Sequence, residues 1–98
     1  MRQLTIPHFD KTLLQPIRLA TVAHLVRCGG EASLAEIRAA VGGPSHSLLW
    51  AHNQVLENAG FVETQKNIFG HQVQTSLVLT DLGRRAFASH QAALDLRQ

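Results

Sequence analysis

The sequence predicts a mainly α-helical domain with one small β-hairpin, an α+β fold. Three observations support this prediction. Capping residues and apolar positions at helical spacing recur before residue 60. Apolar and polar residues then alternate over 61–79, as in a hairpin, and a last helical pattern follows Thr80. The 98 residues fit one domain, predicted to span 1–98.

The N-terminal part is predicted to be an arm followed by a long helix. Residues 1–10 form the arm, because Pro7 prevents a helix from running through them. Asp10 is the expected cap of a helix that ends near Cys28, in which Pro16 is tolerated only near the start or at a kink. On a helical wheel this helix has two apolar faces, although a surface helix of a monomer needs only one. One face contains Leu13, Ile17, Thr21, His24 and Cys28, and the nearly opposite face contains Leu19, Val22 and Val26.

Segment 33–59 is predicted to contain two helices joined by a tight turn. Ser33 and Glu36 have the spacing of a capping box at the start of the shorter helix. Ser45 is the expected N-cap of the longer helix, which runs to about Ala59 before a glycine. Two such helices joined by a glycine-containing turn predict a helix-turn-helix.

The C-terminal part is predicted to be a hairpin and a last helix. The strands of the hairpin 61–79 are expected at 61–66 and 72–79, with the tip between them. The last helix is expected at 80–97. The order helix, helix, helix, hairpin, helix is that of a winged helix-turn-helix domain.

Five short stretches also resemble known families. They are Ile17-Arg18-Leu19, Leu49 with His52, Leu56 to Val62, Thr75, and Leu79 to Phe87. In this order they resemble the winged-helix families of MarR, PadR and ArsR type from about Phe9 to Leu94. The resemblance implies a transcriptional regulator that binds double-stranded DNA. It also implies a homodimer whose terminal helices pack together. It also implies that the third helix enters the major groove and that the wing contacts the backbone or minor groove.

The third helix is predicted to turn one face to the core and another to DNA. The expected buried face contains Leu48, Leu49, Val55, Leu56 and Ala59. His52 falls in the middle of this face, so it is expected to be a boundary histidine with a hydrogen-bond partner rather than a DNA contact. Asn53 at its edge is either an extra polar contact or a packing compromise. The predicted DNA-binding residues are Arg38, Ser45, His46, Ser47, Trp50, Ala51, Gln54, Lys66 and His71.

The predicted DNA surface has few cations. No Lys or Arg lies between Pro44 and Gly60, although arginine to guanine is the commonest specific contact. Trp50 is predicted either to contact DNA, to anchor a protein partner, or to lie in the core. Ile68 and Phe69 at the hairpin tip are expected to fold back on the body. The alternatives are a wedge in the minor groove or a protein contact. These features leave a protein-interaction module as the rival function.

A dimer interface is predicted from the first and last helices. The last helix has an apolar sector too broad for one contact, and the first has two apolar faces. The alternative is that both faces pack within a compact monomer. The predicted interface residues are Leu19, Val22, Val26, Phe87, His90 and Leu94.

The sequence shows no pattern typical of a disulfide, a metal site, a catalytic site or a membrane span. Cys28 is the only cysteine, so no intrachain disulfide can form. The six histidines include no pair at ligand spacing, so no metal or other cofactor is expected. The alternative is a site across a dimer from His8, His90 and Asp10 or Asp81. No catalytic motif and no membrane span is found, so the sequence predicts a cytoplasmic protein that is not an enzyme. A small-molecule effector, if one exists, would bind between the terminal helices and the DNA-binding unit.

Overall fold

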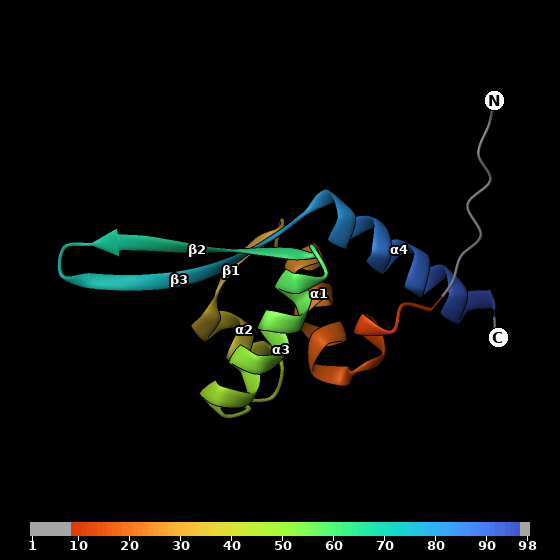
Figure 1. Ribbon diagram of the computed structural model, residues 1–98, viewed down its shortest axis with the longest axis horizontal. Helices are drawn as coiled ribbons and strands as arrows, with labels where there is room; N and C mark the ends of the chain where they lie inside the picture. The colour runs from red at the N-terminus through yellow and green to blue at the C-terminus, as the bar shows by residue number, and fades with distance from the viewer. Residues whose placement is uncertain (1–8, 97–98) are drawn as a thin grey trace.

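The structure, a computed structural model, describes residues 9–96 and has the predicted α+β class. Residues 1–8 of the expected arm lie outside the described residues, as does residue 97 of the expected last helix. In chain order the elements are the 3₁₀-helix η1 (Thr12–Leu14), α1 (Pro16–Arg27), β1 (Glu31–Ser33), α2 (Leu34–Ala40), α3 (His46–Asn58), β2 (Val62–Phe69), β3 (Gln72–Leu79) and α4 (Asp81–Leu96). The helices gather at one end and the β2–β3 hairpin extends from them (Figure 1).

The first helix begins later than the sequence predicts. Pro16 disfavours a helical backbone at the residue before it, and Gln15 is accordingly extended, with ψ 127°. Gln15 caps α1 by accepting a hydrogen bond from the backbone N–H of Arg18 at 3.0 Å. Asp10 instead accepts from Thr12 N–H at 2.9 Å, next to the short helix η1. The expected continuous helix from Asp10 is therefore wrong.

The helix-turn-helix is formed by α2 and α3, with the caps that the sequence predicts. Ser33 Oγ accepts a hydrogen bond from Glu36 N–H at 3.2 Å, and Ser45 Oγ accepts from Leu48 N–H at 3.1 Å. The carboxylate of Glu36 accepts from the Ser33 hydroxyl at 3.2 Å. The turn between the helices contains Gly43, whose φ of +69° favours glycine.

The sheet has three antiparallel strands in the order β1-β3-β2. β1 was not predicted, because three residues are too few to show a strand period. β2 continues to Phe69, so the expected five-residue tip is wrong and the turn consists of Gly70 and His71. The two strands pair from Val62↔Leu79 to Phe69↔Gln72, which makes one long ladder.

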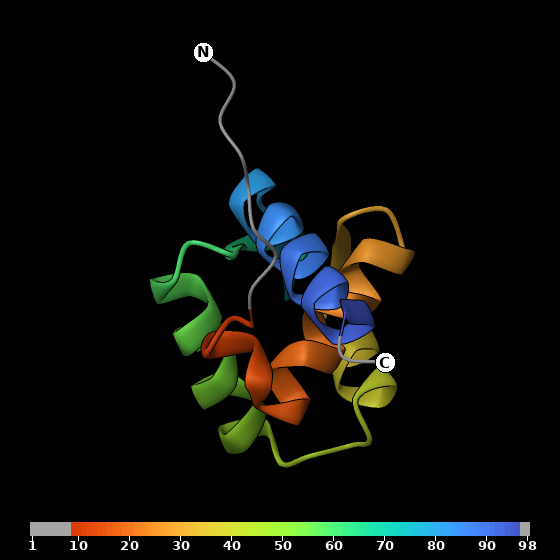
Figure 2. The same cartoon turned by 90° about the vertical axis from the view of Figure 1, so that its right-hand side faces the viewer.

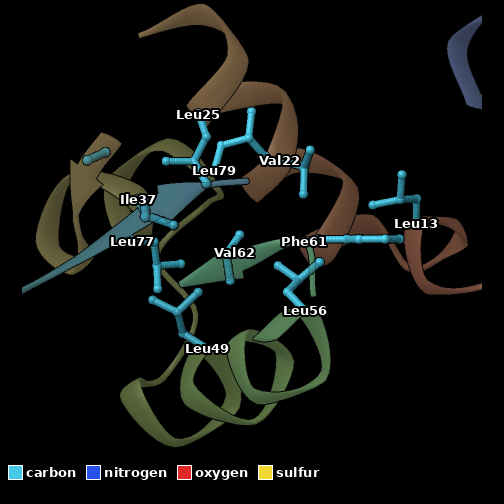
Figure 3. Close-up of a cluster of buried hydrophobic side chains, with 11 residues drawn as sticks. Leu13, Val22, Leu25, Ile37, Leu49, Leu56, Phe61, Val62, Leu77 and Leu79 are labelled. Atoms are coloured by element: carbon cyan, nitrogen blue, oxygen red, sulfur yellow. The ribbon is translucent and has the colours of Figure 1, made fainter. Parts of the chain in front are cut away.

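The hydrophobic core lies between α1, α3 and the base of the hairpin (Figure 3). Val22 and Leu25 come from α1, and Leu49 and Leu56 come from α3. The base of the sheet contributes Val62, Leu77 and Leu79. This packing fixes the hairpin relative to α3, and so places the two elements expected to contact DNA.

The last helix begins at the base of the hairpin. Thr80 Oγ1 accepts from Gly83 N–H at 3.0 Å, which confirms the predicted cap. Gly83 lies so close to Phe61 that a Cβ atom there would collide with the Phe61 carbonyl oxygen. From this point α4 runs alongside the start of the described chain (Figure 2).

Candidate nucleic-acid interface

The outer face of α3 presents small and polar side chains. Ser45, His46, Ser47 and Ala51 are exposed, and Gln54 is half-buried. The hydroxyl of Ser45 accepts from Leu48 N–H in the cap, so the backbone amides of His46 and Ser47 in the first turn are left for an external acceptor. Hydroxyl, imidazole and amide groups of this kind can bond base edges or phosphate oxygens.

Trp50 lies on the same helix and is 47% exposed. This exposure eliminates the core position that the sequence left open. The indole remains available to a groove or to a protein partner, because its ring is a large apolar surface with one N–H donor.

The buried face of α3 is rotated relative to its apolar stripe. Leu49, Asn53 and Leu56 are buried, whereas Leu48 is 44% and Val55 is 38% exposed. The prediction that Leu48 and Val55 are buried was therefore wrong. Leu48 and Val55 lie on one flank of the helix, and Asn53 lies towards the other flank. The orientation of α3 that buries Asn53 therefore exposes Leu48 and Val55.

Asn53 is a packing compromise rather than a polar contact. Its side chain is 3% exposed, and within residues 9–96 neither Oδ1 nor Nδ2 has a hydrogen-bond partner. An unsatisfied buried polar group costs about 1–3 kcal/mol. The helix that carries the candidate interface therefore contains a buried amide that lowers the stability of the fold.

His52 has the hydrogen-bond partner that the sequence predicts for a boundary histidine. Nη1 of Arg18 lies 3.2 Å from His52 Nδ1, and Arg18 Nε donates to the carbonyl oxygen of Thr12 at 2.7 Å. Burial lowers the pKa of His52 below its ordinary value of 6.5, and the positive charge of Arg18 lowers it further. The imidazole is therefore neutral at pH 7.

Arg38 braces the turn before α3. It is half-buried, and its Nε donates to the carbonyl oxygen of Pro44 at 2.6 Å. A guanidinium has five N–H donors, so this bond leaves others for a phosphate. Its position beside the turn fits the predicted backbone contact.

The wing presents Lys66 and His71, both exposed as expected. Ile68 is 74% and Phe69 is 61% exposed, so the expectation that they fold back was wrong. The physical reason is that β2 and β3 continue past the helices, which leaves no layer to cover the tip (Figure 1). Val73, which faces Ile68 across the ladder, is 60% exposed and was not predicted as a surface residue.

The predicted dimer residues divide into buried and available ones. Val22 is fully buried in the core and His90 is 2% exposed, so both predictions were wrong. His90 Nδ1 accepts from Asp10 N–H at 3.1 Å, and its ring meets Phe9 edge-on at 5.5 Å. Leu19, Val26 and Phe87 are partly buried against the same core. The predicted residue that remains exposed is Leu94.

Two α4 leucines outside the prediction are also exposed. Leu82 is 47% and Leu96 is 73% exposed, compared with 36% for Leu94. Their exposure could not be judged from the sequence, because it depends on how much of α4 the body covers.

Among the described residues, the remaining histidine and cysteine side chains form no metal site. His24 Nε2 is buried and has no hydrogen-bond partner among the described residues. Cys28 is exposed, with Sγ 3.4 Å from the Glu31 carbonyl oxygen. Over 9–96 no three potential ligands gather to hold a metal ion. The helices of this part of the chain are also too short or too polar to cross a membrane.

The sequence and the fold are similar to known proteins. Residues 17–97 match the family described as winged helix DNA-binding domain. No protein in the search of curated proteins matches. A transcriptional regulator homologue from Pyrococcus horikoshii OT3 has a similar structure, with a TM-score of 0.70, 28% identity, and coverage of 88% of this chain and 87% of that one.

Two further solved structures are similar at lower identity. The putative transcriptional regulator ytfH from Salmonella typhimurium gives a TM-score of 0.73 at 22% identity, covering 88% of this chain and 74% of that one. The protein smu.1704 from Streptococcus mutans UA159 gives a TM-score of 0.70 at 17% identity, covering 92% of this chain and 84% of that one. At these identities the likeness concerns the fold.

Proposed function

The chain belongs to the family of winged helix DNA-binding domains, and from this premise we propose that it is a homodimeric, sequence-specific transcriptional regulator. The observation that supports the proposal most is the outer face of α3. It combines an exposed N-terminal turn with bonding side chains at His46, Ser47 and Gln54. We place α3 in the major groove and the wing on the backbone or minor groove.

We propose that binding depends more on neutral hydrogen bonds than on cations. α3 contains no Lys or Arg, and the hairpin has one cation, Lys66. Gln54 is the residue we propose to contact adenine, because its amide can bond N6 and N7 together. Arg38 and the amides at the start of α3 are proposed phosphate contacts.

Binding to genomic DNA fragments at graded salt tests this function. Affinity should fall as salt rises, with a shallow slope, because few phosphates are neutralised. Gln54→Ala should weaken binding to the selected sequence by about 1–3 kcal/mol and leave non-specific binding nearly unchanged. Gln91→Ala, an exposed position on α4, is the matched control. Absence of retained DNA even at low salt would reject the proposal.

The dimer we propose is formed through α4. Exposed Leu82, Leu94 and Leu96 replace the buried Val22 and His90 as its centre. Leu94→Glu should shift sedimentation towards the monomer, whereas Leu14→Glu, on exposed η1, should leave the mass unchanged. An unchanged mass in Leu94→Glu would remove this face of α4 from the interface.

A second function is favoured by one observation, the exposed apolar groups Trp50, Ile68 and Phe69. Such a surface fits a protein-interaction module, since tryptophan is frequent among binding hot spots. If DNA is not retained and Trp50→Ala abolishes a protein pull-down, this second function replaces the first.

The narrower features of the regulator are also proposals. They are a MarR, PadR or ArsR-like mode of action, a repressor role, and work in the cytoplasm without catalysis. A small-molecule effector would bind between α4 and the DNA-binding unit.

A further inference from the structure

Arg18 joins three elements around the recognition helix. Its Nε donates to Thr12 O of η1 at 2.7 Å, and its Nη1 lies 3.2 Å from His52 Nδ1 on α3. Its own backbone N–H is held by Gln15 Oε1 at 3.0 Å. Arg18 is therefore held at its backbone by Gln15 and at Nε by Thr12, which orients Nη1 towards the imidazole.

This contact determines the tautomer of His52. A guanidinium has only donors, so His52 Nδ1 must accept and cannot bear a hydrogen. The neutral ring then has its proton on Nε2. The lowered pKa of His52 agrees, since burial and the Arg18 charge both oppose a second proton.

The proton on Nε2 is available to an external acceptor. Within residues 9–96, the hydrogen bond of the His52 ring is made at Nδ1 and none is made at Nε2. Nε2 is also not among the buried side-chain atoms without a partner, which belong to His24 and Asn53, so His52 presents Nε2 to solvent. Its ring is half-buried and its other nitrogen is occupied by Arg18. The Nε2–H group thus reaches solvent from the flank of α3 that faces α1.

From this geometry we propose that His52 Nε2–H donates to a backbone phosphate of DNA and that Arg18 is the residue that positions it. The inference rests on the proposed function. A helix in the major groove contacts bases through its outer face and meets the phosphates along its sides. The contact fixes the register of α3 without contributing to sequence preference.

Two amide substitutions test the donor. In His52→Gln the side-chain nitrogen reaches the place of Nε2, whereas in His52→Asn the amide reaches only the place of Nδ1. We expect His52→Gln to keep affinity within about twofold and His52→Asn to lose about three- to tenfold per site, as for one neutral hydrogen bond. The loss should be equal on specific and non-specific DNA, with an unchanged salt slope, because no charge is removed.

Three results of the DNA measurement would overturn the inference. They are wild-type affinity in His52→Asn, equal loss in both variants, and a loss confined to the specific sequence, which would mean that His52 contacts a base. Thermal melting of both variants checks that they are folded. If wild-type protein binds no DNA, the proposed function fails together with this inference, whereas the three results above leave that function intact.

The nitrogen-15 chemical shifts of the His52 ring test the role of Arg18 without DNA. Wild-type protein at neutral pH should show the tautomer protonated on Nε2. Arg18→Met should raise the population protonated on Nδ1 while melting shows a folded protein. A wild-type ring protonated on Nδ1, or shifts that Arg18→Met does not change, would show that Arg18 does not position this donor.

Discussion

The two ends of the β2–β3 hairpin have the same residue pattern and opposite environments. Val62, Leu77 and Leu79 at the base share one face of the ladder with Ile68 and Val73 near the tip. The first three are at most 8% exposed, whereas Ile68 and Val73 are 74% and 60% exposed. Alternation therefore predicts which side chains share a face, and the presence of a covering layer decides whether that face is buried.

The largest expected effect separates these two ends directly. Leu77→Ala should lower the free energy of unfolding by about 2–5 kcal/mol, because it opens a cavity in the core. Val73→Ala, on the same face, should change it by less than about 0.5 kcal/mol. Urea unfolding of both variants measures the difference. Similar losses would mean that the tip is covered in solution.

Gly83→Ala tests how tightly α4 is held to the base of the hairpin. Alanine normally stabilises a helix relative to glycine by about 1 kcal/mol. Here its Cβ would collide with the Phe61 carbonyl oxygen, so we expect a loss of about 1–3 kcal/mol. Ala88→Gly, at an exposed position of α4, measures the propensity alone. A gain in stability in Gly83→Ala would contradict this close packing.

Asn53→Leu extends the comparison to α3, where a polar group lies under a covering layer. Leucine has the same number of side-chain heavy atoms and no unsatisfied polar group, so unfolding should cost about 1–2 kcal/mol more. Asn58→Leu, exposed on the same helix, should change stability little. Thermal melting of both variants decides the matter. If Asn53→Leu is neutral, the amide has a partner in solution.

The smallest effect is the pH dependence caused by His52. Its pKa is lowered in the folded chain, first by burial and then by Arg18, from an ordinary value of 6.5. The stability that neutral His52 contributes to the fold is therefore fully present above the pKa of the unfolded state. This stability is lost as pH falls through the lowered pKa of the folded state. The stability difference between wild type and His52→Gln should shrink in melts from about pH 7.5 to about pH 5. A stability difference that grows on acidification would show that folding raises the pKa of His52 instead of lowering it.

Much of the fold follows from local sequence features. The caps at Ser33, Ser45 and Thr80 and the alternation of β3 were predicted, and the structure confirms them. The strand β1 was missed, because it depends on pairing with β3 rather than on its own three residues. Pro16 could have given the start of α1, since it disfavours a helix through the residue before it.

The surface was harder to predict than the elements. An apolar stripe centred on His52 predicted burial for Leu48 and Val55, yet tertiary packing buries Asn53 instead. Two apolar faces on α1 indicated a second chain, but this helix lies against α2, α3 and α4 within one chain. A helical wheel shows where apolar groups lie and does not show how many neighbours the helix has.

The base of the hairpin is fastened across 20 residues of chain. Thr80 N–H donates to the Phe61 carbonyl oxygen at 3.0 Å, and the Thr80 hydroxyl donates to that of Gly60. The hairpin is thus anchored to the domain at its base, whereas its turn at Gly70 and His71 is exposed and does not hold the fold together. The length of the hairpin can therefore change without disturbing the hydrogen bonds at its base. Two added residues in each strand would extend it by about 7 Å and keep every side chain on its face.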